Sequence, residues 1–384
     1  PLVKEVLEEN VFLPKSSYDD VLDYIVEQID GSLESLRPTW RENYDGVEGD
    51  RGRDGRFTVG AALAIKSRAL LYAASPLNNP EGDPQKWARA AEAAHDLIKL
   101  NMYSLDDDYS NLFLSSKALD SREMILAYRH DPDNSLEKQN YPVGTEGGNS
   151  GLTPSENLVE AYEYIGAPNP DNRYENRDPR FYATIVYNGC TWNDRTIDIS
   201  ANGQDSYLKN QASRTGYYLK KFLAPNLFLL KDETERHVWP LFRYAEILLN
   251  YAEAMNEAYG PDKTNGYTMS AKEALNAVRR RPGVNMPDIE TSDPIEFRKA
   301  VLHERRIELA FEGHRYWDLV RWQQGDVLSD DVRGVRVTND TSPFQYEIID
   351  VEKRVFEVPK MYRYPFPYYE VQRSQGVLVQ NVGW

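Results

Sequence analysis

Side chains that could perform acid–base or nucleophilic chemistry are plentiful in this chain, but their spacing matches no catalytic motif. Of the 384 residues 61 are acidic, so two carboxylates at the ~5–9 Å separation used for glycoside hydrolysis would meet by chance. The five histidines are scattered without the spacing of metal ligands. Cys190 could be a nucleophile only beside a base, and an inert thiol is the alternative. The pattern therefore predicts no catalytic residue, no metal ligand and no cofactor.

Aromatic residues in polar loops are a more informative pattern. The chain has 26 tyrosines and seven tryptophans, and the segment YNGCTWNDR at 187–195 combines rings with amide, carboxylate and guanidinium groups. An exposed ring can stack on the C–H face of a pyranose while polar side chains bond its hydroxyls. Rings packed beneath their own loops are the alternative. The predicted ligand-binding residues are Tyr187, Trp192, Asn193, Asp194, Trp40, Tyr44 and Tyr207.

Composition narrows the classes of ligand. A net charge of −16 argues against nucleic acid and against an anionic membrane surface as direct partners, whereas a neutral sugar is indifferent to it. A single cysteine excludes an intrachain disulfide. The acidic loop at 45–55 loosely resembles a calcium loop, but Arg51 and Arg53 oppose a cation, so a solvated loop is expected. No apolar run approaches the ~18–20 residues of a membrane helix.

The elements that must position such a site are mainly helical. Apolar spacing and caps predict helices over 16–36, 58–74, 85–100, 241–258 and 270–281. In the first, Val21, Ile25, Ile29 and Leu33 form the expected buried stripe; in the fourth, glutamates and an asparagine occupy the face opposite the apolar one. Closely spaced alanines in the second and third predict a tight antiparallel hairpin, and the last two helices form a second. Both are typical of a tetratricopeptide-like repeat.

The rest of the chain is irregular. Residues 106–240 lose helical periodicity and alternate turn signals with strand-like runs such as 181–189 and 216–223. Long irregular stretches in a compact protein usually carry function. We therefore expect a mainly α fold: a helical scaffold at 1–105 and 241–323, a loop-rich ligand-binding lobe with short strands at 106–240, and a mixed C-terminal segment at 324–384 packing on the scaffold.

One stretch, HERRIELAFEGHRYWDLVRW at 303–322, mixes apolar and charged residues on every face of a helix. A surface helix separates the two kinds, so this stretch is expected to be enclosed with its charges paired. Glu308 has Arg305 three residues before it and Glu312 four residues after it. We interpret the stretch as a structural ion-pair centre that contacts no ligand.

Several segments, in a common order, give the chain a resemblance to the SusD/RagB family, the starch-utilisation-type outer-membrane glycan-binding lipoproteins of Bacteroidota. The resemblance covers essentially the whole chain. It also includes the run FTVGAALAIKSRALLYAASPL near the start, with the Ala-rich helix after it. The other segments are NRDPRFYATIVYNG (176–189), FRYAEILLNYAEAMNE (242–257), ALNAVRRRPGV (274–284), ERRIELAFEGHRYWDLVRW (304–322) and YPFP…QNVGW (364–384).

The resemblance implies a non-enzymatic protein that captures oligo- or polysaccharide at the cell surface and delivers it to a SusC-like TonB-dependent outer-membrane barrel. It also implies a helical segment, a lipobox cysteine and a signal peptide before the point that corresponds to Pro1. The membrane would then be reached only through a lipid anchor that lies outside this chain. Family members vary in their glycan contacts, so no contact is carried over. A tetratricopeptide-type protein-interaction scaffold without glycan and a glycoside hydrolase are the alternatives.

Overall fold

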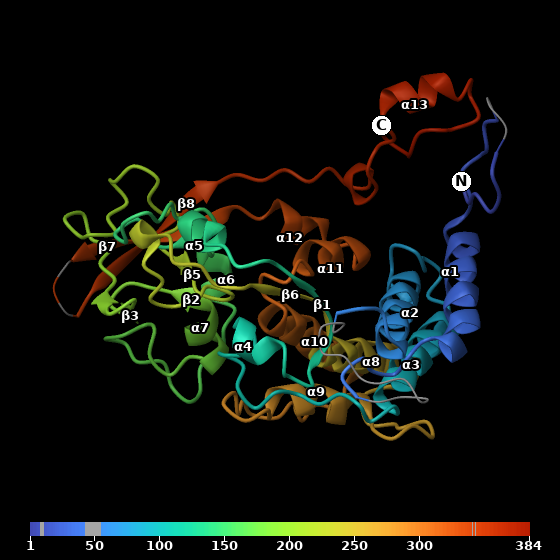
Figure 1. Cartoon of the computed structure of the whole chain (residues 1–384), viewed down its shortest axis with the longest axis horizontal. Helices are drawn as coiled ribbons and strands as arrows, with labels where there is room; N and C mark the ends of the chain where they lie inside the picture. The colour runs from blue at the N-terminus through green and yellow to red at the C-terminus, as the bar shows by residue number, and fades with distance from the viewer. Residues whose placement is uncertain (8–10, 43–54, 340, 342) are drawn as a thin grey trace.

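The computed structural model describes residues 1–7, 11–42, 55–339, 341 and 343–384. It has the expected mainly helical architecture, with a helical scaffold on one side and a lobe of loops and short strands on the other (Figure 1). Among the described residues, no helix is both long and apolar enough to cross a membrane.

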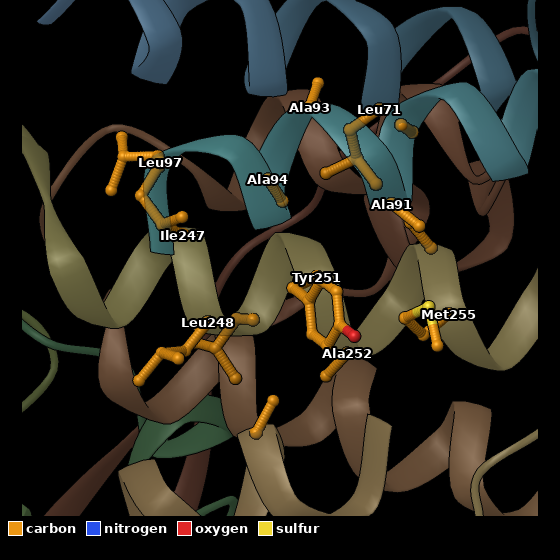
Figure 2. Packing of buried hydrophobic residues seen from close by; sticks show 14 of the residues in the cluster. Leu71, Ala91, Ala93, Ala94, Leu97, Ile247, Leu248, Tyr251, Ala252 and Met255 are labelled. Atoms are coloured by element: carbon orange, nitrogen blue, oxygen red, sulfur yellow. The ribbon is translucent and has the colours of Figure 1, made fainter. Parts of the chain in front are cut away.

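The scaffold is built on two helical hairpins. Its helices are α2 (Val59–Ala74), α3 (Pro84–Ile98), α8 (Tyr244–Tyr259), α9 (Ala271–Arg279) and α10 (Pro294–Glu308). Local signals start four of them: the Thr58, Asp83 and Asp293 side chains cap α2, α3 and α10, and a Ser270–Glu273 capping box opens α9. Buried alanines let α2, α3 and α8 approach closely and share one core (Figure 2). The predicted hairpins are confirmed.

Helix α8 differs from its expected two-faced pattern. Its polar face is buried as well as its apolar one, with Glu246 and Asn250 each 1% exposed and Glu253 3% exposed. Arg68 pairs with Glu246, and Arg321 pairs with Glu253. The polar face is thus turned toward guanidinium groups of other helices, because α8 is the central helix of the scaffold.

Helix α1 (Tyr18–Ser32) buries a different stripe from the predicted one. Leu22 is its buried residue and Val26 packs on the same core, whereas Ile25 is 37% exposed. The charged side of α1 explains the rotation, because Asp19 and Asp23 form ion pairs with residues of α3. A short 3-10 turn, Leu33–Ser35, follows.

In the part of the chain that the structure describes, the lobe is held by four two-stranded antiparallel pairs. Strands β1 (Met124–Arg129) and β6 (Val238–Arg243) pair at its base, where the chain leaves and re-enters the scaffold. The other pairs are β2 (Ile185–Val186) with β5 (Tyr218–Leu219), β3 (Thr191–Trp192) with β4 (Arg195–Thr196), and β7 (Val332–Asn339) with β8 (Gln345–Glu352). Short helices lie between them: α4 (Ser115–Ala118), α5 (Ser135–Asn140), α6 (Glu156–Val159), α7 (Pro179–Thr184) and the 3-10 turn Leu229–Lys231.

The strand predicted at 181–189 is wrong over its first half, because residues up to Thr184 belong to α7. Asp178 caps that helix by accepting a hydrogen bond from the Arg180 amide, and Pro179 occupies its first turn. The Asp-Pro start signal thus outweighs the strand preference of the residues that follow.

After the β7–β8 hairpin, the C-terminal part of the chain extends away from the lobe (Figure 1). Helices α11 (Arg315–Arg321) and α12 (Gly325–Ser329) precede the β7–β8 hairpin, and a 3-10 turn (Lys360–Tyr362) and α13 (Tyr368–Arg373) follow it. The last segment lies beside the N-terminal one (Figure 1). There the Lys15 ammonium donates to Asn381 Oδ1 at 3.0 Å.

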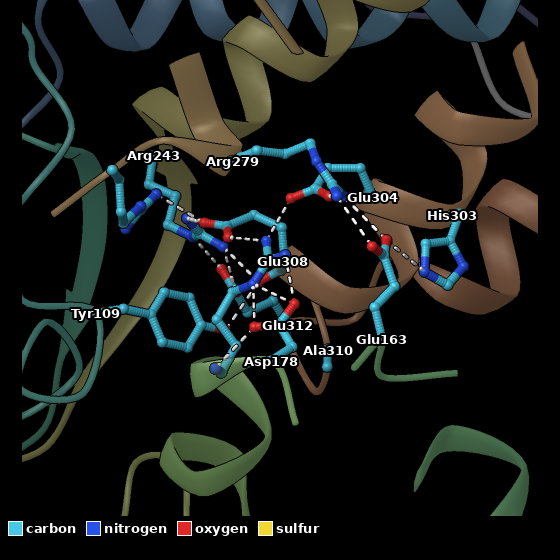
Figure 3. A network of polar contacts seen from close by, with 12 residues as sticks. Tyr109, Glu163, Asp178, Arg243, Arg279, His303, Glu304, Glu308, Ala310 and Glu312 are labelled. Carbon is cyan, nitrogen blue, oxygen red and sulfur yellow. Dashed lines mark hydrogen bonds and ion pairs between the residues drawn. The ribbon is translucent and has the colours of Figure 1, made fainter. Parts of the chain in front are cut away.

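The 303–322 stretch is an ion-pair centre, as interpreted, but its partners come from other elements (Figure 3). Glu308 accepts from Arg243 and Arg281 at 2.7 Å each and from Arg180 at 2.9 Å, while Arg305 pairs with Asp318 instead. Burial would raise the pKa of Glu308, but the three guanidinium groups hold it well below its usual range. The centre therefore joins the scaffold to the lobe.

Candidate functional site

Three of the residues predicted to bind ligand lie on the β3–β4 hairpin. Trp192 is 6% exposed, with the Tyr141 ring edge-on to it at 6.1 Å, so its ring offers no open face. Asn193 and Asp194 have φ angles of 49° and 57° and form the two-residue turn, a conformation that Asn and Asp tolerate well. Asn193 Oδ1 also accepts from the Asn226 amide at 2.9 Å. The polarity of Asn193 and Asp194, which suggested that they bind sugar hydroxyls, is thus explained by the turn that they form.

Tyr187 belongs to a layer of rings inside the lobe. Its ring centroid lies 4.6 Å from Tyr174 and 5.0 Å from Phe181. Its amide donates to Cys190 Sγ at 3.3 Å. Burial raises the pKa of the Cys190 thiol, which favours the unreactive protonated form.

The remaining predicted residues are dispersed. Trp40 lines a separate pocket of about 610 Å³, where the Arg37 and Arg56 guanidinium groups lie 4.8 and 5.7 Å from its ring. Tyr207 is 37% exposed beneath the guanidinium group of Arg336. Tyr44 lies outside the described residues. Among the described residues, the lining of the Trp40 pocket includes no residue of the β3–β4 hairpin, whereas Tyr207 follows Asp205, which pairs with Arg195 of β4.

A different surface of the lobe has the composition that the sequence suggested. We call it the aromatic cleft: a hollow of about 730 Å³ between the 160–177 loop and the β7–β8 hairpin. Three rings, two guanidinium groups and two carboxylates share it. Its lining is Glu160, Tyr164, Pro170, Asp171, Arg173, Arg177, Thr338, Phe344, Gln345 and Tyr346.

The cleft rests on the ring layer that contains Tyr187. Tyr346 meets Tyr174 edge-on at 5.4 Å, and its hydroxyl accepts from Asn188 Nδ2 at 3.2 Å. The backbone at Gly189 passes close to Phe344: a Cβ atom added to this glycine would lie 3.7 Å from the Phe344 ring. The predicted segment thus supports the cleft from below, although its own rings do not line it.

Two arginines are fixed along the other wall. The Arg177 guanidinium lies 3.9 Å from the centre of the Tyr164 ring and donates to the carbonyls of Val159 and Tyr162. Arg173 pairs with the buried Glu156. Burial would lower the pKa of Arg173, but the neighbouring acidic groups raise it above its usual value, so it stays charged. Arg177 is 4% exposed and its Nε and Nη1 already donate to backbone carbonyls, so Arg173 is the guanidinium group better placed to donate to an oxygen-rich ligand.

Sequence reasoning missed the residues of the cleft. Turn signals in the sequence mark the loop at 166–180, but no local pattern marks residues 343–346 as a binding surface. Proline and tyrosine in both segments are the available signal. The two segments meet only through tertiary packing, which no local pattern reports.

A helical-repeat scaffold that carries a loop-rich lobe with a ring- and guanidinium-lined cleft is the architecture of a ligand-binding protein. A family model described as the SusD family matches residues 115–384, and the chain belongs to that family.

Among curated relatives, the chain is similar to the SusD-like protein P38 of Formosa agariphila. The identity is 26% over 376 residues, covering 91% of this chain and 67% of the relative. P25 of the same organism is 23% identical over 83% of this chain and 58% of its own. The chain thus spans about 58–67% of the length of these two relatives.

Solved structures agree on the fold. A SusD-like protein from Bacteroides fragilis superposes with a TM-score of 0.79 at 29% identity, covering 100% of this chain and 75% of that one. A SusD-like carbohydrate binding protein from the same species gives a TM-score of 0.78 at 28% identity, covering 98% and 74%. A surface glycan-binding protein A from Bacteroides fluxus, at 20% identity and TM-score 0.62, covers 97% and 73% and supports the fold alone.

Proposed function

We propose that this protein binds oligo- or polysaccharide at the aromatic cleft and performs no chemistry on it. The observation that carries the proposal is the convergence of three rings, the charged Arg173 guanidinium group and two carboxylates on one hollow. Rings stack on the C–H faces of sugars, while guanidinium, amide and carboxylate groups bond the hydroxyls. The SusD-like carbohydrate binding protein of B. fragilis, 28% identical to this chain, supports the same class of ligand.

The cleft implies weak binding to each sugar unit. It is open to solvent, so each ring contributes roughly 0.5–1.5 kcal/mol beyond its buried area, and single sites reach only micromolar or poorer affinity. A long glycan that contacts several rings would gain affinity in steps.

The cellular location of the protein and its partner are also proposals. Membership of the SusD family favours a protein at the outer face of the outer membrane that passes its glycan to a SusC-like TonB-dependent barrel. The chain spans only part of its relatives' length, so anchor and barrel contact are assigned to the whole protein.

Affinity electrophoresis of the chain in gels that contain neutral polysaccharides tests the binding directly. Starch, xylan, β-1,3-glucan and galactan form a suitable panel. Retardation by at least one polymer, with no release of reducing sugar from it, is the expected result. Release of reducing ends by purified protein would contradict the proposal that binding is non-catalytic.

A further inference from the structure

Two arginines of the 303–322 stretch differ from their neighbours. Arg305 pairs with Asp318, and Arg321 with Asp318 and Glu253. Arg315 forms no hydrogen bond or ion pair with any residue that the structure describes, and Arg306 donates only to the carbonyl of Asn157, at 2.5 Å. Both are partly buried.

Burial is the largest cause of the lowered pKa of both guanidinium groups, and the nearby acids, Asp318 for Arg315 and Asp330 and Glu160 for Arg306, offset it only in part. Burial lowers the pKa of Arg315 to about 10, helped by the positive charge of Arg306. The pKa of Arg306 is lowered too, first by burial, and Arg333 adds to the effect. Other buried arginines in the body, such as Arg180 and Arg321, have raised pKa values because carboxylates pair with them. Uncompensated buried charge is costly, so a missing anionic partner is the simplest explanation.

The carboxylates nearest to Arg306 and Arg315 already form ion pairs with other arginines. Asp318 accepts from Arg305 and Arg321, and Glu160 accepts both terminal nitrogens of Arg333. Asp330 attracts Arg306 only at longer range. Among the described residues, the Asp330 carboxylate forms no ion pair with Arg306 or Arg315.

Both arginines line a pocket of about 700 Å³, which we call the arginine pocket. The rings of Phe311 and Tyr316 lie on its wall, beside polar residues such as Asn157. Glu160 lines both this pocket and the aromatic cleft. The two hollows therefore share a wall residue.

We propose that the arginine pocket is a subsite for an acidic substituent of the bound glycan, a uronate carboxylate or a sulfate ester, held by Arg315 and Arg306. Guanidinium groups bind both kinds of oxyanion through paired N–H donors. The ring walls give the sugar that carries the acid a stacking surface. The inference rests on the proposed function and adds to the binding of neutral sugar rings at the cleft a preference for a polysaccharide that carries an acidic substituent.

Two pairs of polymers test this on the whole chain, at equal ionic strength, by calorimetry. Polygalacturonate is compared with its carboxyl-reduced form, and ι-carrageenan with its desulfated form. We expect one acidic polymer to bind roughly tenfold or more tightly than its neutral counterpart, as charge-assisted hydrogen bonds imply. The polymer that shows the preference identifies carboxylate or sulfate as the group recognised.

Substitutions assign the preference to the pocket. Arg315→Gln and Arg306→Gln should each bring the acidic polymer to within about threefold of the neutral one. Arg280→Gln removes the same charge from an exposed arginine outside both sites and should leave the preference intact. Equal binding of acidic and neutral forms by the unmodified chain would overturn the inference, as would a preference that survives both pocket variants.

Chemical labelling gives a readout independent of the polymers chosen. Phenylglyoxal should modify Arg315 in the folded chain, and galacturonate or galactose 6-sulfate, but not galactose, should slow that modification. Equal rates with all three sugars would contradict the subsite. A failure of the proposed function can be told apart from a failure of this inference. If only the aromatic cleft is wrongly assigned, Tyr346→Ala leaves the binding of both acidic and neutral polymers unchanged, while Arg315→Gln still abolishes the preference for the acidic polymer.

Discussion

Tyr346 of β8 meets the ring of Tyr174 edge-on with their centroids 5.4 Å apart. This contact joins the β7–β8 hairpin to the 160–177 loop, and the aromatic cleft exists only because the two are held together. Tyr174 is 2% exposed and supports Tyr346 from inside the lobe, whereas Tyr346 lines the cleft and is available to a ligand.

Trp192→Ala should destabilise the protein without weakening glycan binding by the folded molecules. Removing a buried tryptophan costs about 3–5 kcal/mol through the cavity it leaves, and Trp192 lies outside the cleft lining. Urea unfolding and calorimetry below the transition measure the two effects. Tyr207→Ala is the exposed control, with a change in unfolding free energy within about 0.5 kcal/mol. A stable Trp192→Ala protein with lost affinity would restore Trp192 to the binding site.

Glu308→Gln should be among the most destabilising single changes in the chain. It leaves Arg180, Arg243 and Arg281 without their shared carboxylate, and breaking a buried ion pair in this way costs about 3–5 kcal/mol. Differential scanning calorimetry measures the fall in Tm. Glu296→Gln removes the acid of an exposed pair and should change Tm little. Equal melting of the two variants would refute a structural role for the ion-pair centre.

Stability should fall steeply in acid. Burial would raise the pKa of Glu312, but Arg243 and Lys221 lower it from 4.5 to about 2. A depressed pKa stabilises the fold above the unfolded value and loses that stabilisation as pH falls toward the folded value. Glu312 alone accounts for about 3 kcal/mol between pH ~4.5 and ~2. Urea midpoints across this range should decline less for Glu312→Gln; identical slopes would contradict the assignment.

Gly60 and Gly31 should respond oppositely to alanine. A Cβ at Gly60 in α2 would overlap the Tyr103 hydroxyl, whereas a Cβ at Gly31 in α1 meets nothing within 4 Å. Gly31→Ala should therefore raise the unfolding free energy by about 0.5–1 kcal/mol through helix propensity. Gly60→Ala should lower it. Chemical denaturation compares them, and a stabilised Gly60→Ala would show that the α2 packing is looser than described.

The helical scaffold was predictable because its signals are local. Capping residues and alanine spacing are present in the sequence around α2, α3 and α9. Burial was less predictable: the stripe of α1 runs through Leu22, and α8 is enclosed on its polar face too, because both depend on guanidinium groups and carboxylates of other helices. Such partners cannot be read from one helix.

The candidate site was predictable in kind but not in place. Rings and polar groups in the 187–195 segment suggested a sugar site, yet that segment forms a hairpin turn and an inner layer of rings. The residues that line the cleft come from residues 160–177 and 338–346, which precede and follow the scaffold helices α8, α9 and α10 in the sequence. Their meeting depends on tertiary contacts, among them the Tyr346–Tyr174 ring pair and the Arg333–Glu160 ion pair.

Glycan affinity of Tyr346→Ala tests the central claim most directly. Calorimetry would use a polysaccharide that retards the unmodified chain in affinity gels, with Tyr369→Ala as control because Tyr369 is 66% exposed and lies outside the cleft. We predict that Tyr346→Ala weakens binding by roughly tenfold, the loss of one stacking ring, while Tyr369→Ala binds normally. Unchanged affinity in a folded Tyr346→Ala protein would place the glycan elsewhere and contradict the assignment of the aromatic cleft.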